Sequence, residues 1–170
     1  MIAGAASAYP GETASFKGTS WGTIPAAVME WVGEDTATLD QIYISPYSVT
    51  RLGEASLNRV LYLYNYKNQL YSVIVTAKGK NNHDAMLRYL TGEHKSFDPS
   101  SSSTYHLWKG KLTNIELYYD QEKDEASVVY TAVLMREVTL EEIDSAMDFL
   151  DKMAEEGTAS ESMWDGLFDK

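Results

Sequence analysis

The pattern Gly-x-Ser-x-Gly, which surrounds the nucleophilic serine of many hydrolases, spans residues 18–22. In those enzymes the serine lies on a sharp turn between a buried strand and a helix, and an earlier strand contributes to the oxyanion hole. A helix is predicted after Ser20, but the 19 residues before it contain no convincing strand. We therefore expect a turn that leads into a helix, with Trp21 packed beneath it, and we predict that the protein is not an enzyme.

Three acidic residues between two predicted strands, Asp120, Glu122 and Asp124, alternate as the ligands of a calcium-binding loop do. The glycine that such a loop needs at its sixth position is missing, and Thr131 occupies the place of the bidentate glutamate. A charged hairpin turn explains the same residues without a bound ion. We therefore predict no metal site here and, for the whole chain, no cofactor.

The chain has three histidines and no cysteine, so thiolate metal sites and disulfides are excluded. The histidines, His83, His94 and His106, do not have the spacing of metal ligands. His83 falls on the apolar stripe of a predicted helix, and we expect it to be a partly buried core residue. Gly79-Lys80 lacks the upstream glycine of a phosphate-binding loop. These residues therefore give no catalytic candidate.

Tyrosine is the residue type that most suggests a binding surface, because the chain has 12 tyrosines and many fall in predicted strands. Within residues 58–66, tyrosines alternate with Leu61 and Leu63, and alternate strand residues point to opposite faces. We expect the leucines to meet the helices and the tyrosines to form the open face of the sheet, where rigid rings with polar tips suit recognition. The alternative is that cross-strand tyrosine pairs only stabilise a half-exposed sheet. The candidate binding residues are Tyr62, Tyr64, Tyr66, Tyr119 (or Tyr118) and Tyr130.

A second candidate binding element is the apolar cluster at the end of the chain, which follows a polar break after Gly157. Its candidate binding residues are Trp164 and Phe168, and Met163 and Leu167 complete the cluster. Three interpretations stay open: the cluster docks on its own domain, on a twin subunit in a homodimer, or in a groove of a partner protein.

Three helices are predicted from apolar residues at helical spacing. The first spans residues 23–32, with Thr23 as its cap, and the second spans residues 82–91. The third follows a capping box of Thr139 and Glu142, and its apolar stripe is Ile143, Met147, Leu150 and Met153.

The strands are predicted from β-branched and aromatic residues between turn signals. The clearest pair is a hairpin of residues 58–66 and 69–78, which turns at Lys67-Asn68. The others are residues 41–45 and 49–52, interrupted at Pro46, and residues 105–108, 112–119 and 126–134.

The predicted order is helix, three strands, helix, three strands, helix, and short links between strands favour antiparallel pairing. We predict an α+β fold of two αβββ units, with about six strands in a largely antiparallel sheet, helices on one face and a further C-terminal helix. The two units share residues at an offset of 55, which predicts an internal duplication. The matched pairs are Val60/Ile115, Tyr64/Tyr119, Ser72/Ser127, Val73/Val128, Thr76/Thr131 and Ala77/Ala132.

Charge divides the 170-residue chain unevenly. Residues 137–170 carry 11 acids and 2 bases, whereas residues 1–136 carry 14 acids and 12 bases. We predict a flexible segment at 1–15, the αβββ-αβββ domain at 16–136, and an acidic helix and tail at 137–170. The acidic tail favours a basic partner, or is simply a solvated surface, and a net charge of −11 argues against nucleic-acid binding.

The location of the protein is suggested by Ala6-Ser7-Ala8, which resembles the cleavage site of a secretory signal. A flexible N-terminus explains these small residues equally well. No apolar run approaches the roughly 18 residues that span a bilayer, so no transmembrane segment is predicted.

The sequence reads Phe-Lys-Gly-Thr-Ser-Trp-Gly-Thr at 16–23 and Tyr-His-Leu-Trp-Lys-Gly at 105–110. With residues 70–73, 78–79 and 115–120, these segments resemble a broad group of uncharacterised secreted or periplasmic bacterial proteins. Their pattern is F-x-G-x-x-W-G, then a hairpin, a helix and a Y-x-W-x-G turn. The resemblance covers roughly residues 16–134. It implies structural motifs and an exported protein, without an activity.

Two looser resemblances concern architecture. The repeated units are similar to two-repeat secreted inhibitors of the β-lactamase-inhibitor type, although those proteins carry disulfides. The order of elements and the acidity are similar to class I type III secretion chaperones.

The expected function is therefore that of an exported, non-enzymatic domain that binds an unknown protein partner. One alternative is an intracellular acidic chaperone or immunity-like protein. The other is a small-molecule or glycan binder that uses an aromatic sheet face.

Overall fold

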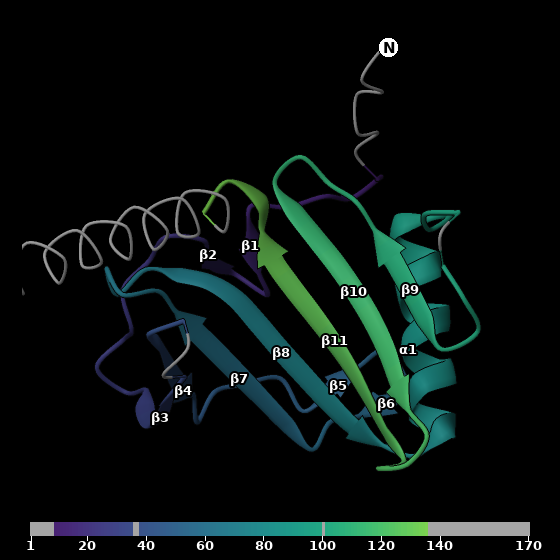
Figure 1. The fold of residues 1–170 in the computed structure, drawn as a ribbon, viewed down its shortest axis with the longest axis horizontal. Coiled ribbons are helices and arrows are strands. Elements are labelled where there is room, and N and C mark those ends of the chain that lie inside the picture. Colours follow the sequence, from purple (N-terminus) through teal and green to yellow (C-terminus); the bar gives the residue numbers. More distant parts are fainter. Residues whose placement is uncertain (1–8, 36–37, 100, 136–170) are drawn as a thin grey trace, which may run out of the picture. The chain divides into compact units, whose positions relative to one another are not determined.

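The computed structural model describes residues 9–35, 38–99 and 101–135, which belong to one structural unit. Its centre is a seven-stranded antiparallel sheet in the order β3-β4-β7-β8-β11-β10-β9 (Figure 1). The sheet strands are β3 (Glu30–Asp35), β4 (Asp40–Ile44), β7 (Arg59–Tyr64), β8 (Leu70–Lys78), β9 (Tyr105–Trp108), β10 (Thr113–Asp120) and β11 (Glu125–Ala132).

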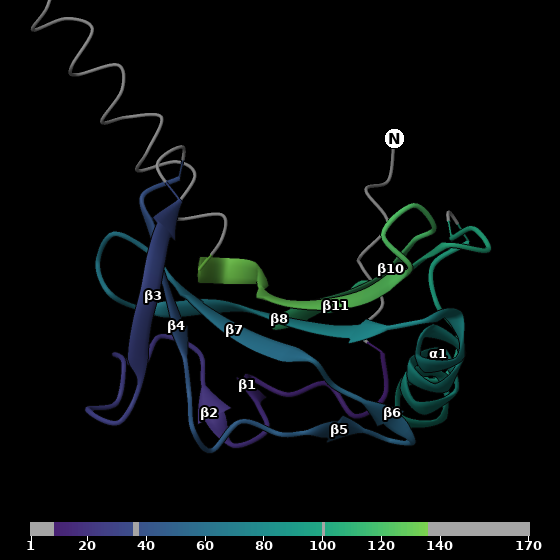
Figure 2. The same cartoon turned by 90° about the horizontal axis from the view of Figure 1, so that it is seen from below.

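A second layer covers one face of this sheet. It consists of the helix α1 (Lys80–His94) and two small hairpins, β1 (Ser15–Phe16) with β2 (Thr19–Ser20), and β5 (Arg51–Leu52) with β6 (Ala55–Ser56). Figure 2 shows the sheet from its edge, with these elements on one side. The fold is thus α+β with a mostly antiparallel sheet, as predicted. Among the described residues, no helix is long and apolar enough to cross a membrane.

The strands form two three-stranded meanders. In the first meander, β4, β7 and β8 lie side by side in the sheet in the order in which they occur in the chain. In the second, β9, β10 and β11 do the same. The last strand of each meander pairs with the other, because β8 lies beside β11. The two meanders therefore have the same strand order, and α1 joins them. The internal duplication itself stays a prediction.

The predicted helix over residues 23–32 was wrong. Gly22 N donates to Leu70 O at 2.8 Å, and Leu70 N donates to Thr23 O at 2.9 Å, so the backbone at this point pairs with β8. Residues 30–35 then form β3, which pairs with β4. Tertiary pairing thus overrides an apolar spacing that also suits β-branched and aromatic strand residues. This strand is why the sheet has seven strands and why the first unit, as described, has no helix before its strands.

The second predicted helix is confirmed as α1, which is three residues longer at its end than predicted and runs to His94. Its apolar stripe buries His83, Ala85, Met86 and Leu90 against the sheet. The hairpin of β7 and β8 is also confirmed, with Asn68 in the left-handed region (φ 62°) at its turn. The predicted third helix, together with Trp164 and Phe168, lies outside the described residues.

Candidate functional site

The predicted orientation of the β7 tyrosines was wrong. Tyr62 is 6% exposed and Tyr64 is fully buried, on the face that the second layer covers. Leu61 and Leu63 are half-buried on the opposite face. The wide rings fill the space between the sheet and the loops, and their hydroxyls find partners there: Tyr64 donates to Met29 Sδ at 3.2 Å, and Ser48 Oγ donates to the Tyr62 hydroxyl at 3.4 Å.

The other candidate tyrosines do not form one surface with this pair. Tyr130 is 8% exposed and packs on Phe16, with ring centroids 4.9 Å apart. Tyr119 is half-buried against His83 and donates to Asp124 Oδ1 at 2.5 Å. Tyr66 is exposed, after the end of β7. Tyr118 is exposed on the opposite face of the sheet, away from the β7 tyrosines.

One row of paired residues crosses all seven strands on the covered face. We call it the transverse row, and its members are Trp31, Tyr43, Tyr62, Val73, Tyr130, Ile115 and Trp108, in spatial order from β3 to β9. Directly paired residues in adjacent strands project from the same face of a sheet. The row is buried from Trp108, which is 1% exposed, to Tyr62, whereas Trp31 at its other end is 54% exposed.

At the β9 end of the transverse row, the loop after α1 covers both the outer edge of β9 and its aromatic side chains. Leu107 O accepts a hydrogen bond from Asp98 N at 2.7 Å, and Tyr105 O accepts one from Ser102 N at 2.7 Å. Phe97 lies against the rings of His106 and Trp108, with centroids 4.6 and 5.7 Å away. The loop after α1 therefore satisfies the outer backbone groups of β9 and buries its aromatic side chains.

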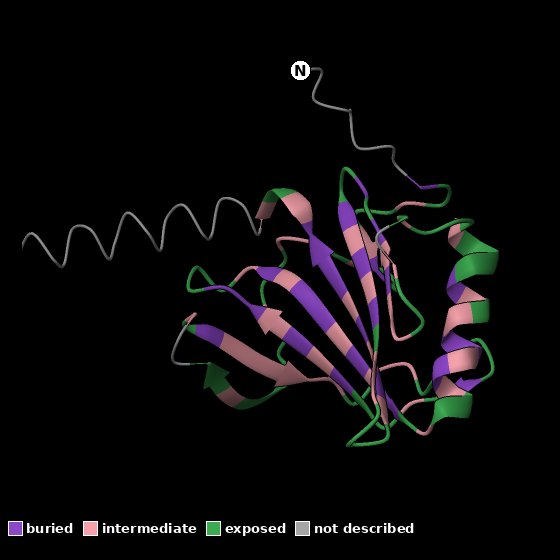
Figure 3. Ribbon diagram, turned by 45° about the vertical axis from the view of Figure 1, so that its right-hand side comes forward, coloured by how far each residue is buried: buried purple, intermediate pink, exposed green. Residues whose placement is uncertain are grey.

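The β3 end is open by comparison. Among the described residues no strand pairs with the outer side of β3, and five of its six residues are exposed (Figure 3). Of eleven exposed large hydrophobic residues in the described part of the chain, six lie within residues 24–47. They are Ile24, Val28, Trp31, Val32, Leu39 and Tyr47. Exposed apolar side chains gathered in this way mark interaction surfaces.

A groove of about 410 Å³ lies between two of these exposed segments, and we call it the aromatic groove. Tyr62 and Tyr64 line its sheet side, and the rest of its lining comes from residues within 18–20, 23–29 and 45–47. Ile24 is 71% exposed and Tyr47 is 81% exposed within this lining. The two buried tyrosines thus border a groove after all, but from the covered face of the sheet and next to side chains that the sequence did not single out.

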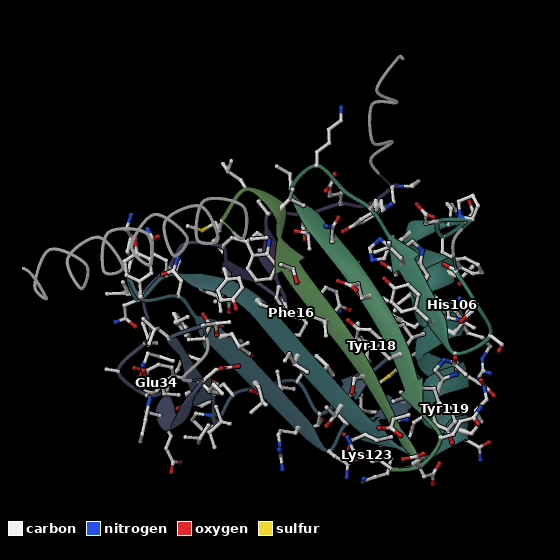
Figure 4. The ribbon with its side chains drawn as sticks, in the orientation of Figure 1. Phe16, Glu34, His106, Tyr118, Tyr119 and Lys123 are labelled. Carbon is white, nitrogen blue, oxygen red and sulfur yellow. The ribbon has the colours of Figure 1, made fainter. Side chains whose placement is uncertain are left out.

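The electrostatics of this region favour cations outside the groove and neutral groups inside it. Burial, together with the neighbouring Tyr62 and Tyr43, raises the pKa of Tyr64 to about 12, so its phenol stays neutral. Residues 18–50 contain four acids and no base. Of these acids, Glu30 and Glu34 are exposed on β3. Figure 4 shows Glu34 at the β3 end of the molecule and His106 at the opposite end.

The motifs that could carry chemistry have structural places. Ser20 is exposed on the two-residue strand β2, next to Trp21, whose Nε1 donates to Thr113 Oγ1 at 2.7 Å. Asp120 Oδ1 accepts hydrogen bonds from Lys123 N and Glu122 N, both at 3.0 Å. The backbone and side chain of Lys123, followed by Glu122 N, hold the pKa of Asp120 below its ordinary value. Within residues 9–135 as described, no group of three histidine, aspartate or glutamate side chains could hold a metal ion.

Sequence reasoning missed the residues that make the β3 end distinctive. Ile24, Val28 and Trp31 lie within the segment predicted as a helix, and Tyr47 follows Pro46, where the predicted strands are interrupted. Two signals pointed to this surface: the acidic character of residues 18–50, and the β-branched and aromatic residues at 28–32.

Comparisons with protein-family models, with curated proteins and with solved structures give no match to this chain.

Proposed function

We propose that this chain is a non-enzymatic protein-binding domain, and that the aromatic groove with the β3 end of the sheet is its binding surface. The observation that carries the proposal is that three exposed apolar side chains, Ile24, Val28 and Tyr47, line a groove bordered by two buried tyrosines. Aromatic residues around a central pocket are typical of the energetically important part of protein interfaces. The acidic segment 137–170 remains a second candidate, and an exported location remains an expectation from the sequence.

The groove favours a partner segment that inserts one bulky apolar side chain. Its walls offer Ile24 and Val28 on one side and the Tyr47 ring on the other, and its volume of about 410 Å³ exceeds that of a single large side chain. Each fully buried Leu, Phe or Met side chain contributes about 1.5–3 kcal/mol. Removal of the exposed apolar walls from water adds to this gain.

Charge favours a basic partner segment over a second copy of the chain. Glu30 and Glu34 are exposed on the edge strand and have no ion-pair partner among the described residues. An antiparallel pairing of two β3 strands would bring these acids close to each other, and like charges on paired strands are destabilising. Lysine or arginine residues on either side of the apolar anchor would instead meet them.

A glycan or small-molecule binder is the second candidate function. It is favoured by two exposed rings with flat surfaces, that of Tyr47 at the groove and that of Trp31 on β3. The intracellular chaperone alternative has no such observation in its favour.

The test uses a labelled peptide of sequence Lys-Lys-Leu-Trp-Leu-Lys-Lys and its counterpart in which glutamate replaces every lysine. We expect fluorescence anisotropy of the full chain to show saturable binding of the basic peptide and none of the acidic one. Binding should weaken as salt is raised above about 0.15 M, because exposed ion pairs are screened.

Variants then place the peptide on the molecule. Ile24→Ser and Tyr47→Ser should each weaken binding about 10-fold or more, as expected for apolar anchors of an interface. Leu112→Ser is the matched control, because Leu112 is a similarly exposed apolar residue outside the groove. Equal affinity of wild type, groove variants and control would contradict the proposal. Binding of neutral oligosaccharides in place of the peptide would favour the second candidate.

A further inference from the structure

A second cavity of about 240 Å³ lies on the covered face, away from the aromatic groove, and we call it the tyrosine pocket. The β1–β2 hairpin forms one wall, the C-terminal half of α1 forms another, and β10 and β11 contribute the floor. Its principal lining residues are Tyr9, Phe16, Lys17, Tyr89, Ile115 and Tyr130. Phe16 and Ile115, each 2% exposed, are the aliphatic and phenyl groups of a lining that is otherwise rich in polar side chains.

Hydrogen-bond donors converge on this pocket. Lys17 Nζ donates to the Tyr89 hydroxyl at 2.7 Å, which leaves the Tyr89 proton and the other ammonium protons for further acceptors. The Tyr130 hydroxyl forms no hydrogen bond within the described residues. Burial, and then the neighbouring Tyr89 and Tyr9 phenols, raise the pKa of Tyr130 far above its usual range, so the hydroxyl keeps its proton and is a donor. Tyr9 is already engaged, since it donates to Thr113 O at 2.7 Å.

Lys17 occupies its position at a cost in backbone strain. Its φ of 46° and the φ of 90° at Gly18 place both central residues of the hairpin turn in the left-handed region. Asparagine, aspartate or glycine is the usual choice at such a turn, because their backbones adopt this conformation with less strain. Strained residues of this kind cluster at ligand sites. Here the strained residue is the one that brings a positive charge to the mouth of the pocket.

We propose that the tyrosine pocket binds a small organic monocarboxylate. The carboxylate would accept hydrogen bonds from Tyr130, Tyr89 and Lys17, and its apolar body would pack on Phe16 and Ile115. One ammonium group matches one negative charge. Glu93 also lines the pocket, and its negative charge opposes every anion but a dianion such as phosphate the most. This site goes beyond the proposed function, because its lining shares only Gly18 with the aromatic groove.

The probe is benzoate, with benzamide as its neutral counterpart of the same shape. Titration of the full chain, followed by two-dimensional NMR, should give saturable shifts at the residues that line the pocket, with a dissociation constant on the order of 1 mM for so small a ligand. Benzamide should bind at least about 10-fold more weakly, because it has no charge to pair with Lys17. Equal binding of the two compounds, or no saturable shift with benzoate, would overturn the proposal.

Two variants assign the donors. Lys17→Met should weaken benzoate binding about 10-fold, and Tyr130→Phe should weaken it about 5-fold, because each removes one donor and keeps the shape of the side chain. Lys123→Met and Tyr118→Phe are matched controls outside the pocket and should leave the affinity unchanged. If Tyr130→Phe perturbs the fold, the Lys17 variant decides, since Lys17 is exposed on a turn. Unchanged affinity in Lys17→Met would overturn the proposal.

Discussion

The two ends of the transverse row are built from the same residue type and have opposite surroundings. Trp108 at the β9 end is 1% exposed, and its Nε1 donates to Lys95 O at 3.3 Å. Trp31 at the β3 end is 54% exposed, and its Nε1 donates to Gln41 Oε1 at 2.7 Å. A loop and α1 cover the first end, and no described element covers the second. A tryptophan on the core face of a sheet therefore contributes to stability only where a second layer covers it.

The largest expected effect is a difference in the unfolding free energy that is lost when each of the two tryptophans is replaced. Trp108→Ala should lower the free energy of unfolding by about 3–5 kcal/mol, because it leaves a cavity among Phe97, His106 and Ile115. Trp31→Ala should cost less than about 1 kcal/mol, because its ring is already half in water. Urea unfolding of both variants measures the difference. Similar losses would show that Trp31 is a core residue in solution and would end the comparison.

The second prediction concerns the β9 end of the transverse row, where a buried histidine makes the folding stability depend on pH. Burial, followed by the charges of His83 and Lys80, lowers the pKa of His106 below its ordinary 6.5. The groups on neighbouring elements are His83, Lys80 and Asp84 of α1 and Tyr119 of β10. The unfolded chain therefore binds this proton more readily than the folded protein, and stability falls as the pH drops below about 6.5.

His106→Phe should flatten this acid dependence, because it removes the buried group that titrates and keeps a ring between Phe97 and Trp108. Denaturant unfolding between about pH 5 and pH 8 gives the measurement. His94→Gln is the control, since His94 lies at the opposite end of α1 from His83 and is hydrogen-bonded to Pro10 O. The same acid loss in His106→Phe as in wild type would place the sensitive group elsewhere.

A smaller effect is expected at the covered edge of β9. Ser101 Oγ accepts a hydrogen bond from Leu107 N at 3.1 Å, so Ser101→Ala should cost about 0.5–1.5 kcal/mol. Hydrogen exchange at the Leu107 amide should become faster. Unchanged exchange would mean that the loop does not protect this edge in solution.

The smallest effect concerns the floor of the aromatic groove at alkaline pH. The folded pKa of Tyr64 is raised to about 12 from an ordinary 10, so the protein loses stability as the pH rises from about 10 to 12. Tyr64→Phe should remove part of this loss, and near pH 7 it should cost less than about 1 kcal/mol, because sulfur is a weak acceptor. An unaltered alkaline transition would show that another phenol dominates it.

Local patterns made much of the sheet predictable. The β7–β8 hairpin, α1 and the second meander follow from turn residues and periodicity, because their pairings join strands that are close in the sequence. The segment at 23–32 was mistaken because its start pairs with Leu70, far along the chain, and no local signal reports a pairing of that kind. Its end begins β3, whose partner β4 is close in the sequence, but its apolar spacing also suits a helix.

The site was less predictable than the fold for a related reason. Alternation along β7 shows that tyrosines and leucines face opposite sides, but it does not show which side a second layer covers. That choice depends on Phe16 and the loop residues Met29 and Ser48, which pack against or bond to the tyrosines. The exposure of Ile24 and Tyr47 follows from the same packing and has no sequence pattern of its own.

The indole signals of Trp31 and Trp108 test the binding surface most directly. Two-dimensional NMR of the full chain during titration with the basic peptide reports both side chains in one experiment. A binding surface at the β3 end predicts that the Trp31 Nε1 signal shifts and saturates with the peptide, while the Trp108 Nε1 signal stays in place. Saturable binding that leaves the Trp31 signal unmoved, or moves both signals alike, would contradict it.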